Sequence, residues 1–237
     1  MLQTAIVDRA VPATPRSLLV RLTLNGPFPF LAGQAALIGA HRQPTRRPYS
    51  IAVGPAESSR DRALEFLIGL GADGTPGPHL PDLTPGTQVD LEGPLGSFVF
   101  PESPDETNFL FVAGGTGIAP LRAMWHQALA GDPSWRISVV YSARTPDEFA
   151  FDDELSALAE FGRITYVRTV TRHSGGAWQG GSGRIGRAML EPAVAGRGTL
   201  CYVCGPESLV HEVPGMLREI GIPTERIRVE EWAFRAP

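Results

Sequence analysis

The pattern of apolar residues changes once along the chain, near residue 104, and this change restricts the fold more than any other feature. Before it, short apolar runs are broken by Gly and Pro, as in the antiparallel strands of a small barrel or sandwich. These runs are Ser17–Leu24, Gln34–Ile38, Tyr49–Val53, Leu64–Leu70 and Gln88–Leu91. After it, apolar strands alternate with helical segments, which is typical of a parallel sheet covered by helices. Strands are expected at Phe109–Ala113, Arg136–Tyr141, Ile164–Val170, Leu200–Val203 and Ile227–Glu230, and helices at Gly117–Ala130, Asp152–Ala159 and Glu207–Ile220.

The two patterns predict two domains, and a length of 237 residues agrees with one or two. The segment Phe100–Thr107, which is acidic and holds two prolines, is the natural hinge. We therefore expect one domain over residues 1–103 and a second over residues 104–237.

Composition excludes several classes of protein. A net charge of −4 offers no basic field for nucleic acid. Two cysteines are too few for a disulfide framework or for a four-thiolate iron–sulfur cluster. All 21 cationic residues are arginine, so Schiff-base and P-loop lysines are absent. No apolar run reaches the roughly 20 residues of a membrane span, and the start lacks a secretory signal, so we expect a soluble cytoplasmic protein.

The strongest local signal is the segment FLFVAGGTGIAPL at residues 109–121. An apolar strand runs into Gly114, Gly115, Thr116 and Gly117, and a helix follows. Glycines at this point let backbone N–H groups approach a pyrophosphate at the helix N-terminus. Pro120 stands where the dinucleotide fingerprint has its third glycine. The segment predicts an anion site, and the alternative is a glycine-rich turn that binds no ligand.

Basic residues follow the next two expected strands. Ser142 and Arg144 come after the strand that ends at Tyr141, where NAD-binding folds usually place an acid for the ribose 2′-hydroxyl. Arg172 follows the next strand, and Arg184 lies further on. Arginine forms forked hydrogen bonds to phosphate, so the pattern favours the 2′-phosphate of NADPH. The alternative for each arginine is an ordinary solvated charge.

A third motif, Arg47-Pro48-Tyr49-Ser50, opens a strand in the first half of the chain. It places a cation, a rigid turn residue, an aromatic ring and a hydroxyl within four positions, a set that can hold a phosphate and a planar heterocycle. The motifs RPYS, GPLGSF at 93–98, GGTGIAP at 114–120 and Cys204-Gly205-Pro206 follow one another in this order. Together they make the chain resemble the ferredoxin–NADP reductase family of flavoproteins over nearly its whole length.

The resemblance implies a six-stranded Greek-key barrel for the flavin and an α/β domain for NAD(P). It implies that Arg47 contacts the FAD phosphates or ribityl chain, that Pro48 belongs to the same cofactor strand, that Tyr49 packs on the isoalloxazine, and that Ser50 lies near flavin N5. On the dinucleotide side it implies contacts from the GGTGIAP and Cys-Gly-Pro segments, with Thr116 and Cys204 nearest the nicotinamide. These residues are Gly114, Gly115, Thr116, Gly117, Pro120, Cys204, Gly205 and Pro206.

The chain departs from the family pattern at two places. Gly77 stands where the family commonly has the Ser or Thr that receives the FAD pyrophosphate, so backbone amides or Thr75 would have to substitute, and FMN stays open as an alternative. Plant-type members end in an aromatic residue over the flavin, with a glutamate two positions before it. Glu230 and Trp232 keep this spacing, although the chain continues to Pro237. We expect Ser50, Cys204 and Glu230 to be the catalytic group and Trp232 to be a candidate flavin cover.

The function that these features imply is hydride transfer from NADPH, or else NADH, to bound FAD, followed by single-electron transfer to a separate redox protein. A ferredoxin, a flavodoxin or an oxygenase component is the expected partner. The basic stretch His41–Arg47 is a candidate docking site for an acidic one, and the alternative, which we slightly favour, is that Arg42 and Arg46 are solvated loop charges. Two alternatives remain, a free-flavin reductase and a flavin-binding electron-transfer or sensor subunit without turnover. We expect a monomer, no metal site, and no thioredoxin-like role for Cys201 and Cys204.

Overall fold

The computed structural model describes residues 1–77, 79–80, 82–172 and 177–231, and it forms two compact units. The first unit is Met1–Glu102 together with Arg122–Gln127, and the second is Ser103–Leu121 with the chain from Ala128 onward. Arg122–Gln127 is the middle of helix α2 (Ile118–Leu129), so one helix contributes to both units. Each unit is described by itself below.

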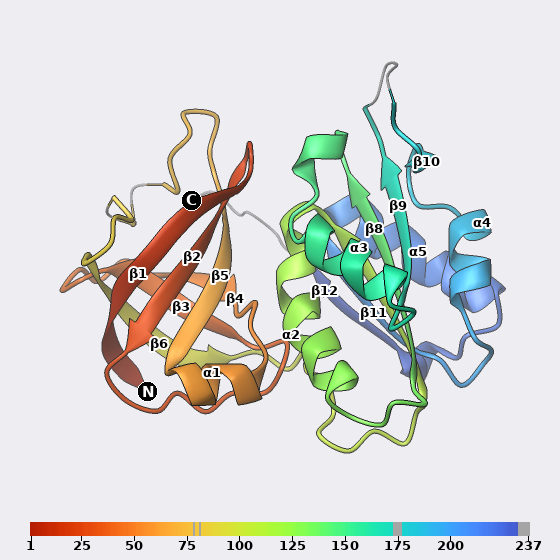
Figure 1. Ribbon diagram of the computed structural model, residues 1–237, viewed down its shortest axis with the longest axis horizontal. Coiled ribbons are helices and arrows are strands. Elements are labelled where there is room, and N and C mark those ends of the chain that lie inside the picture. Colours follow the sequence, from red (N-terminus) through yellow and green to blue (C-terminus); the bar gives the residue numbers. More distant parts are fainter. Residues whose placement is uncertain (78, 81, 173–176, 232–237) are drawn as a thin grey trace. The chain divides into compact units, whose positions relative to one another are not determined.

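The first unit is an antiparallel barrel of six strands (Figure 1). In sheet order the strands are β4 (Arg47–Ser50), β3 (Ala35–Ala40), β6 (Gln88–Leu95), β1 (Leu2–Thr14), β2 (Ser17–Leu24) and β5 (Ala63–Gly69). Strand β6 returns to lie between β3 and β1, which is the Greek-key feature. The two end strands meet through a bridge between Ile51 and Phe66, and the amide of Ala52 donates to the carbonyl of Glu65 at 2.7 Å. The predicted barrel is thus confirmed.

The alternation of apolar and polar residues explains how the barrel strands bury their inner faces. In β2, Val20, Leu22 and Leu24 point inward while the residues between them are less buried. This period of two is the signature of a strand with one buried face. In β5 every residue from Ala63 to Ile68 is buried, because α1 (Pro55–Asp61) and neighbouring side chains also cover the outer face. One of these buried residues is a carboxylate, Glu65.

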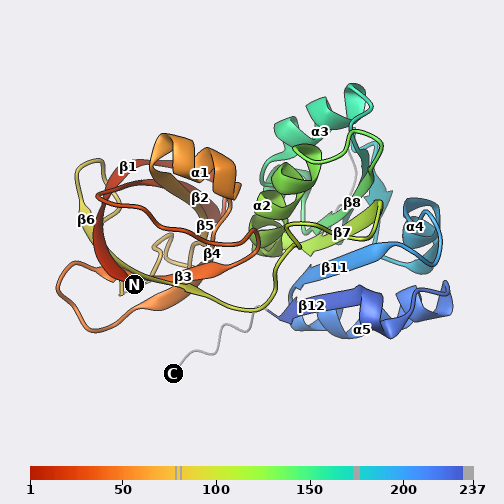
Figure 2. The same ribbon diagram turned by 90° about the horizontal axis from the view of Figure 1, so that it is seen from below.

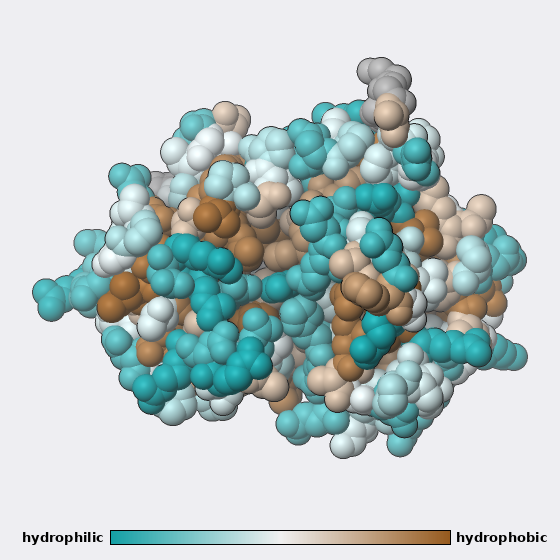
Figure 3. All heavy atoms as spheres, in the orientation of Figure 1, coloured by the Kyte–Doolittle hydropathy of each residue, from teal (hydrophilic) through white to brown (hydrophobic). Residues whose placement is uncertain are grey.

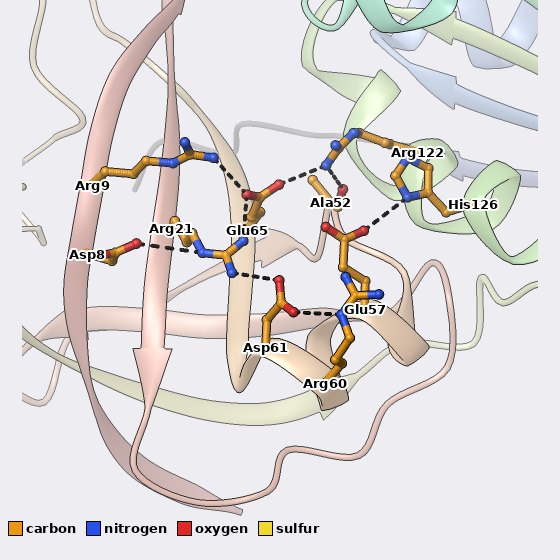
Figure 4. Close-up of polar contacts among 10 residues, drawn as sticks. All are labelled: Asp8, Arg9, Arg21, Ala52, Glu57, Arg60, Asp61, Glu65, Arg122 and His126. Carbon is orange, nitrogen blue, oxygen red and sulfur yellow. Dashed lines mark hydrogen bonds and ion pairs between the residues drawn. The ribbon is translucent and has the colours of Figure 1, made fainter. Parts of the chain in front are cut away.

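Glu65 is the centre of an ion network in the first unit, shown in Figure 4. Its side chain is 5% exposed; Oε1 contacts Arg9 at 3.3 Å and Arg21 at 3.2 Å, and Oε2 accepts from Arg122 at 2.9 Å. The same Arg122 nitrogen donates to the carbonyl of Ala52 at 2.7 Å. Burial by itself would raise the pKa of Glu65, but the charges and hydrogen bonds of Arg122 and Arg21 outweigh it and hold this pKa below its ordinary value.

The second unit is a parallel sheet of six strands in the order β10-β9-β8-β7-β11-β12. The strands are β7 (Asn108–Gly114), β8 (Arg136–Ala143), β9 (Thr165–Val170), β10 (Gly181–Ser182), β11 (Leu200–Gly205) and β12 (Ile227–Glu231). Helices α4 (Arg187–Leu190) and α5 (Glu207–Glu219) lie on one face, and α3 (Asp152–Glu160) lies on the other (Figure 2). The strand order reverses between β7 and β11, which is where open α/β sheets bind their ligands.

The predicted α/β architecture is confirmed, but several elements differ from the sequence expectation. Strand β1, helix α1 and the short elements β10 and α4 were not predicted. Just before β10, Trp178 stacks on Phe149, with ring centroids 5.5 Å apart. This contact anchors the described residues that lead into β10.

The surface of each unit on the face shown in Figure 3 is largely polar, with smaller apolar areas between polar ones. Across the described residues, no helix combines the length and the apolar character needed to cross a membrane. The same residues contain no group of three or more His, Cys, Asp or Glu side chains that is arranged to hold a metal ion.

Candidate functional site

The side chains of the RPYS motif lie on both faces of strand β4. Arg47 and Tyr49 lie on one face of the strand and Ser50 on the other, as the alternation of a strand requires. Tyr49 is buried in the barrel, where its hydroxyl lies 2.6 Å from His79 Nε2. Arg47 is half-buried, and no ion pair with a described carboxylate is formed by its side chain. Arg47 and Tyr49 therefore lie on the same face of β4, and Ser50 lies on the opposite face.

Two buried polar atoms in this region have no hydrogen-bond partner among the described residues, Ser50 Oγ and His79 Nδ1. Buried polar groups in folded proteins are nearly always paired, so orphaned atoms point to a missing ligand or water. A cation without an acid beside it, Arg47, lies near both Tyr49 and His79, since its charge lowers the pKa of each. These residues fit a flavin nucleotide, which combines an anionic phosphate with a planar polar ring.

Gly77 and Thr75, the two positions considered for the flavin phosphate, differ in their surroundings. Gly77 has a positive φ of 95°, and a Cβ at this position would lie 3.3 Å from the His79 ring. Thr75 does not stand in for the missing hydroxyl of Gly77, because its Oγ1 is held by the carboxylate of Asp73 at 3.0 Å. Sequence reasoning did not single out His79, because no local motif marks it.

Two of the basic side chains in the candidate docking stretch His41–Arg47 have acidic neighbours. His41 lies 2.8 Å from Asp90, and Arg46 lies 3.5 Å from both Asp90 and Glu92. Strand β6 therefore supplies carboxylates beside these two basic side chains, and their charge is locally compensated. Arg42 is exposed, with its backbone amide on Asp90 at 2.9 Å. A sequence pattern cannot show this pairing, because the acids lie about 45 residues away in the chain.

In the second unit, the turn after β7 packs directly against the turn after β11. A Cβ at Gly117 would lie 2.5 Å from the carbonyl oxygen of Cys204, and one at Gly114 would lie 2.8 Å from the ring of Pro206. A Cβ at Gly205 would lie 3.0 Å from the amide nitrogen of Gly114. Both predicted motifs thus meet at the switch point of the sheet, and glycine is required there by close backbone approach.

The tip of the glycine turn is open. Gly115 is exposed, has a φ of 54°, and would have nothing within 4 Å of an added Cβ. Thr116 beside it is half-buried, whereas Pro120 is buried inside α2. A hydrogen bond fixes this turn to strand β8: the Tyr141 hydroxyl donates to the carbonyl of Gly115 at 2.9 Å. Tyr141 is a positioning residue that sequence reasoning missed, although its place at the end of an apolar strand was an available signal.

The residues expected to recognise a 2′-phosphate lie together at the carboxyl ends of β8 and β9. Ser142 is half-buried, Arg144 and Arg172 are exposed, and the amide of Arg172 donates to the carbonyl of Arg144 at 2.7 Å. No ion pair joins either arginine to a described carboxylate. Arg184 is instead paired with Glu212 at 2.7 Å.

Cys204 and Glu230 are neighbours across strands β11 and β12. Cys204 Sγ lies 4.0 Å from Glu230 Oε2, and burial raises the pKa of Glu230 to about 7. Cys201 lies on the opposite face of β11, where burial raises the pKa of its thiol to about 12. Neither cysteine forms a disulfide, so the end of β11 presents a buried thiol beside a carboxyl group. The predicted flavin cover, Trp232, lies outside the described residues.

The barrel with its orphaned polar atoms and the parallel sheet with its glycine turns define a class, that of two-domain oxidoreductases that bind a flavin and a nicotinamide dinucleotide. Residues 111–214 match the family model of the oxidoreductase NAD-binding domain. The chain is 32% identical over 197 residues to ferredoxin–NADP reductase B of Sorangium cellulosum, a match that covers 79% of this chain and 78% of the relative.

Further comparisons agree with this class. The chain is 35% identical over 156 residues to methane monooxygenase component C of Methylosinus trichosporium, which covers 65% of this chain and 43% of that longer relative. The structure of a ferredoxin reductase in carbazole 1,9a-dioxygenase superposes with a TM-score of 0.85 at 25% identity, over 98% of this chain and 70% of the other. The chain belongs to the ferredoxin–NADP reductase-like family. It is an NAD(P)H-dependent flavin oxidoreductase, with FAD and a nicotinamide dinucleotide as its cofactors.

Proposed function

We propose that this protein takes electrons from NADPH, in preference to NADH, and passes them one at a time through FAD to a separate redox protein. The acceptor we propose is a ferredoxin, a flavodoxin or an oxygenase component. FAD, when bound, accepts electrons from a nicotinamide as a pair and releases them singly, which is the chemistry that such a transfer needs. The chain's own residues bind and orient the two cofactors, and they hold or move the proton that accompanies the electrons.

The observation that supports the flavin role is the set of polar and aromatic groups on β4, one of which is a buried hydroxyl without a partner among the described residues. Arg47 supplies a cation for phosphate, Tyr49 an aromatic face, and Ser50 a buried hydroxyl that has no partner among the described residues. In an apolar interior an unpaired hydroxyl is unfavourable unless a ligand completes its hydrogen bond. We propose Ser50 as the group that bonds the polar edge of the flavin ring.

The dinucleotide role that we propose assigns the phosphates to the glycine turn at Gly114–Gly117. The exposed tip at Gly115 lets the backbone approach a pyrophosphate without a side chain in the way, and Tyr141 keeps this tip in place. Thr116 and Cys204 would flank the nicotinamide. Arg144 and Arg172 are assigned to the 2′-phosphate, since both are exposed and neighbouring.

Glu230 is proposed as the group that holds a proton during turnover. Its raised pKa, about 7, keeps a substantial protonated fraction at neutral pH, which is what an acid–base group needs. Its contact with Cys204 places the carboxyl group beside the thiol at the end of β11. The thiol itself is buried and is assigned a packing role against the nicotinamide.

The acceptor is proposed from the relatives. Methane monooxygenase component C and an aromatic O-demethylase reductase subunit of Amycolatopsis are both 30% or more identical to this chain, and both names describe one part of an enzyme with several components. Both relatives are longer than this chain, which spans 43% and 57% of their lengths. Because each of these names describes one component or subunit among several, we propose an acceptor on another polypeptide.

The test is spectroscopic. The purified protein should be yellow, and its flavin band should bleach under anaerobic conditions when NADPH is added. Ferricyanide or cytochrome c should then restore the band with steady-state turnover. A protein that neither contains nor takes up FAD refutes the proposal. Flavin that separates from the protein on gel filtration indicates a free-flavin reductase, and bound flavin without turnover indicates an electron-transfer or sensor subunit.

A further inference from the structure

His79 is a buried histidine that none of the motifs accounts for. It lies in the segment between β5 and β6, and the residue is only 4% exposed. The imidazole stacks on Tyr49 with ring centroids 5.8 Å apart and an interplanar angle of 16°. Its Nε2 lies 2.6 Å from the Tyr49 hydroxyl oxygen, while its Nδ1 is buried and has no partner among the described residues.

The protonation states of this pair follow from the surroundings. Burial and the nearby charge of Arg47 lower the pKa of His79, so the imidazole is neutral at pH 7 and carries one N–H. Burial raises the pKa of Tyr49 to about 12, so the phenol keeps its proton. Two arrangements satisfy the 2.6 Å contact: the Tyr49 hydroxyl donates to Nε2 and the imidazole proton lies on Nδ1, or Nε2–H donates to the hydroxyl oxygen. In the first arrangement His79 Nδ1–H is a buried donor with no partner among the described residues, and it is the arrangement that the proposal below adopts.

The space beside Nδ1 explains the departure at Gly77. A Cβ at Gly77 would lie 3.3 Å from both Nδ1 and Cε1 of His79, so the imidazole occupies the space into which a side chain at position 77 would extend. Position 77 has a φ of 95°, which also favours glycine. The donor that a Ser or Thr would provide at this position is therefore available from His79.

We propose that His79 is a further cofactor-binding residue, whose Nδ1–H donates to an anionic oxygen of the flavin nucleotide's phosphate group. Arg47 supplies the positive charge for the same anion, and Tyr49 sets the tautomer of the ring that donates to it. The proposal rests on the proposed flavin function. It deepens that function by naming the donor that takes the place of the missing hydroxyl at Gly77.

The test measures flavin binding by the apoprotein, with no turnover. His79→Gln keeps an amide near the position of Nε2 and removes the donor at Nδ1, whereas His79→Asn keeps an amide donor near Nδ1 and removes the link to Tyr49. Fluorescence titrations with FAD, FMN and riboflavin separate the phosphate contact from the ring contact, since riboflavin has no phosphate. We expect His79→Gln to weaken FAD and FMN about tenfold or more and riboflavin less than twofold, and His79→Asn to weaken FAD less than threefold.

The outcomes separate this proposal from the proposed function. A wild-type protein that binds no flavin overturns both. A wild-type protein that binds FAD while His79→Gln binds it equally well overturns only the role of His79, as does an equal loss of FAD and riboflavin. A measurement on the wild type does not depend on the folding of any variant: ¹⁵N-histidine NMR should show the Nδ1-protonated tautomer for His79, with a larger shift at Nδ1 on adding FAD than on adding riboflavin. The Nε2-protonated tautomer would contradict the proposal.

Discussion

Replacing Arg122 by methionine should destabilise the barrel unit more than any exposed arginine substitution. Arg122 makes two short contacts to buried acceptors, Glu65 Oε2 at 2.9 Å and the carbonyl of Ala52 at 2.7 Å (Figure 4). Methionine fills a similar volume and donates nothing. The variant therefore leaves a buried carboxylate oxygen and a buried carbonyl unpaired, although Arg21 and Arg9 still contact the other oxygen of Glu65.

The magnitude follows from these contacts. A hydrogen bond to a charged group contributes about 1.5–3 kcal/mol, and breaking one member of a buried pair costs about 3–5 kcal/mol when the other charge is left alone. Because two other arginines remain beside Glu65, we expect a loss of about 3 kcal/mol in the free energy of unfolding. For a chain of this size that loss lowers Tm by about 6–12 °C, which differential scanning calorimetry measures directly.

The matched control is Arg60→Met in the same network. Arg60 is 72% exposed and contacts Asp61 at 2.9 Å, so its loss should cost less than about 0.5 kcal/mol. The pH dependence adds a second criterion. The folded-state pKa of Glu65 lies below its ordinary value of 4.5, so its contribution is present above that value and is lost as the pH falls through the folded-state pKa. The difference between wild type and Arg122→Met should therefore shrink as the pH falls below about 4.5. Equal effects of the two substitutions, or a difference that does not change with pH, would refute the reasoning.

Three further predictions concern the second unit. Arg144→Ala should lower kcat/KM about tenfold or more for NADPH and less than twofold for NADH, and an equal loss for both would remove Arg144 from 2′-phosphate recognition. In the wild type, kcat/KM should fall as the pH rises through about 7, where Glu230 loses its proton, and Glu230→Gln should flatten this profile; an unchanged profile in the variant contradicts the role. Gly117→Ala should raise the KM for NADPH at least tenfold, because its Cβ would lie 2.5 Å from the Cys204 carbonyl oxygen, whereas Gly186→Ala, with nothing within 4 Å of the new Cβ, should leave it unchanged. Comparable KM values for the two alanine variants would show that the turn tolerates the side chain.

The sequence predicts the strands and helices well where apolar residues keep a strict period. β2 and the predicted run Ser17–Leu24 coincide, and α5 lies within one residue of its prediction. The missed elements lack such a period. β1 contains a proline and two charged residues, and it is interrupted by register shifts between Val7 and Arg9 and between Pro12 and Thr14. α1 buries only Ser58, so no apolar stripe marks it.

The parts of the site that could be predicted are those formed by contiguous sequence motifs. The glycine turn after β7 and the Cys-Gly-Pro turn after β11 are contiguous motifs, and the structure brings them together. His79 and Tyr141 act through partners 30 and 26 residues away, and such contacts leave no local pattern. The same is true of Asp90, which contacts His41 and Arg46 from a different strand.

The seam of the barrel has a consequence for its motions. In the described part of the barrel, β4 joins β5 through Ile51 and Ala52, whereas β1 and β2 pair along most of their length. Few cross-strand bonds mean a low free energy of local opening, so amide exchange should be fastest where the RPYS strand meets the seam and slowest in β1 and β2. A nucleotide bound to β4 would reduce the population of the locally opened state by mass action. The barrel without nucleotide would then be the form most susceptible to proteolysis.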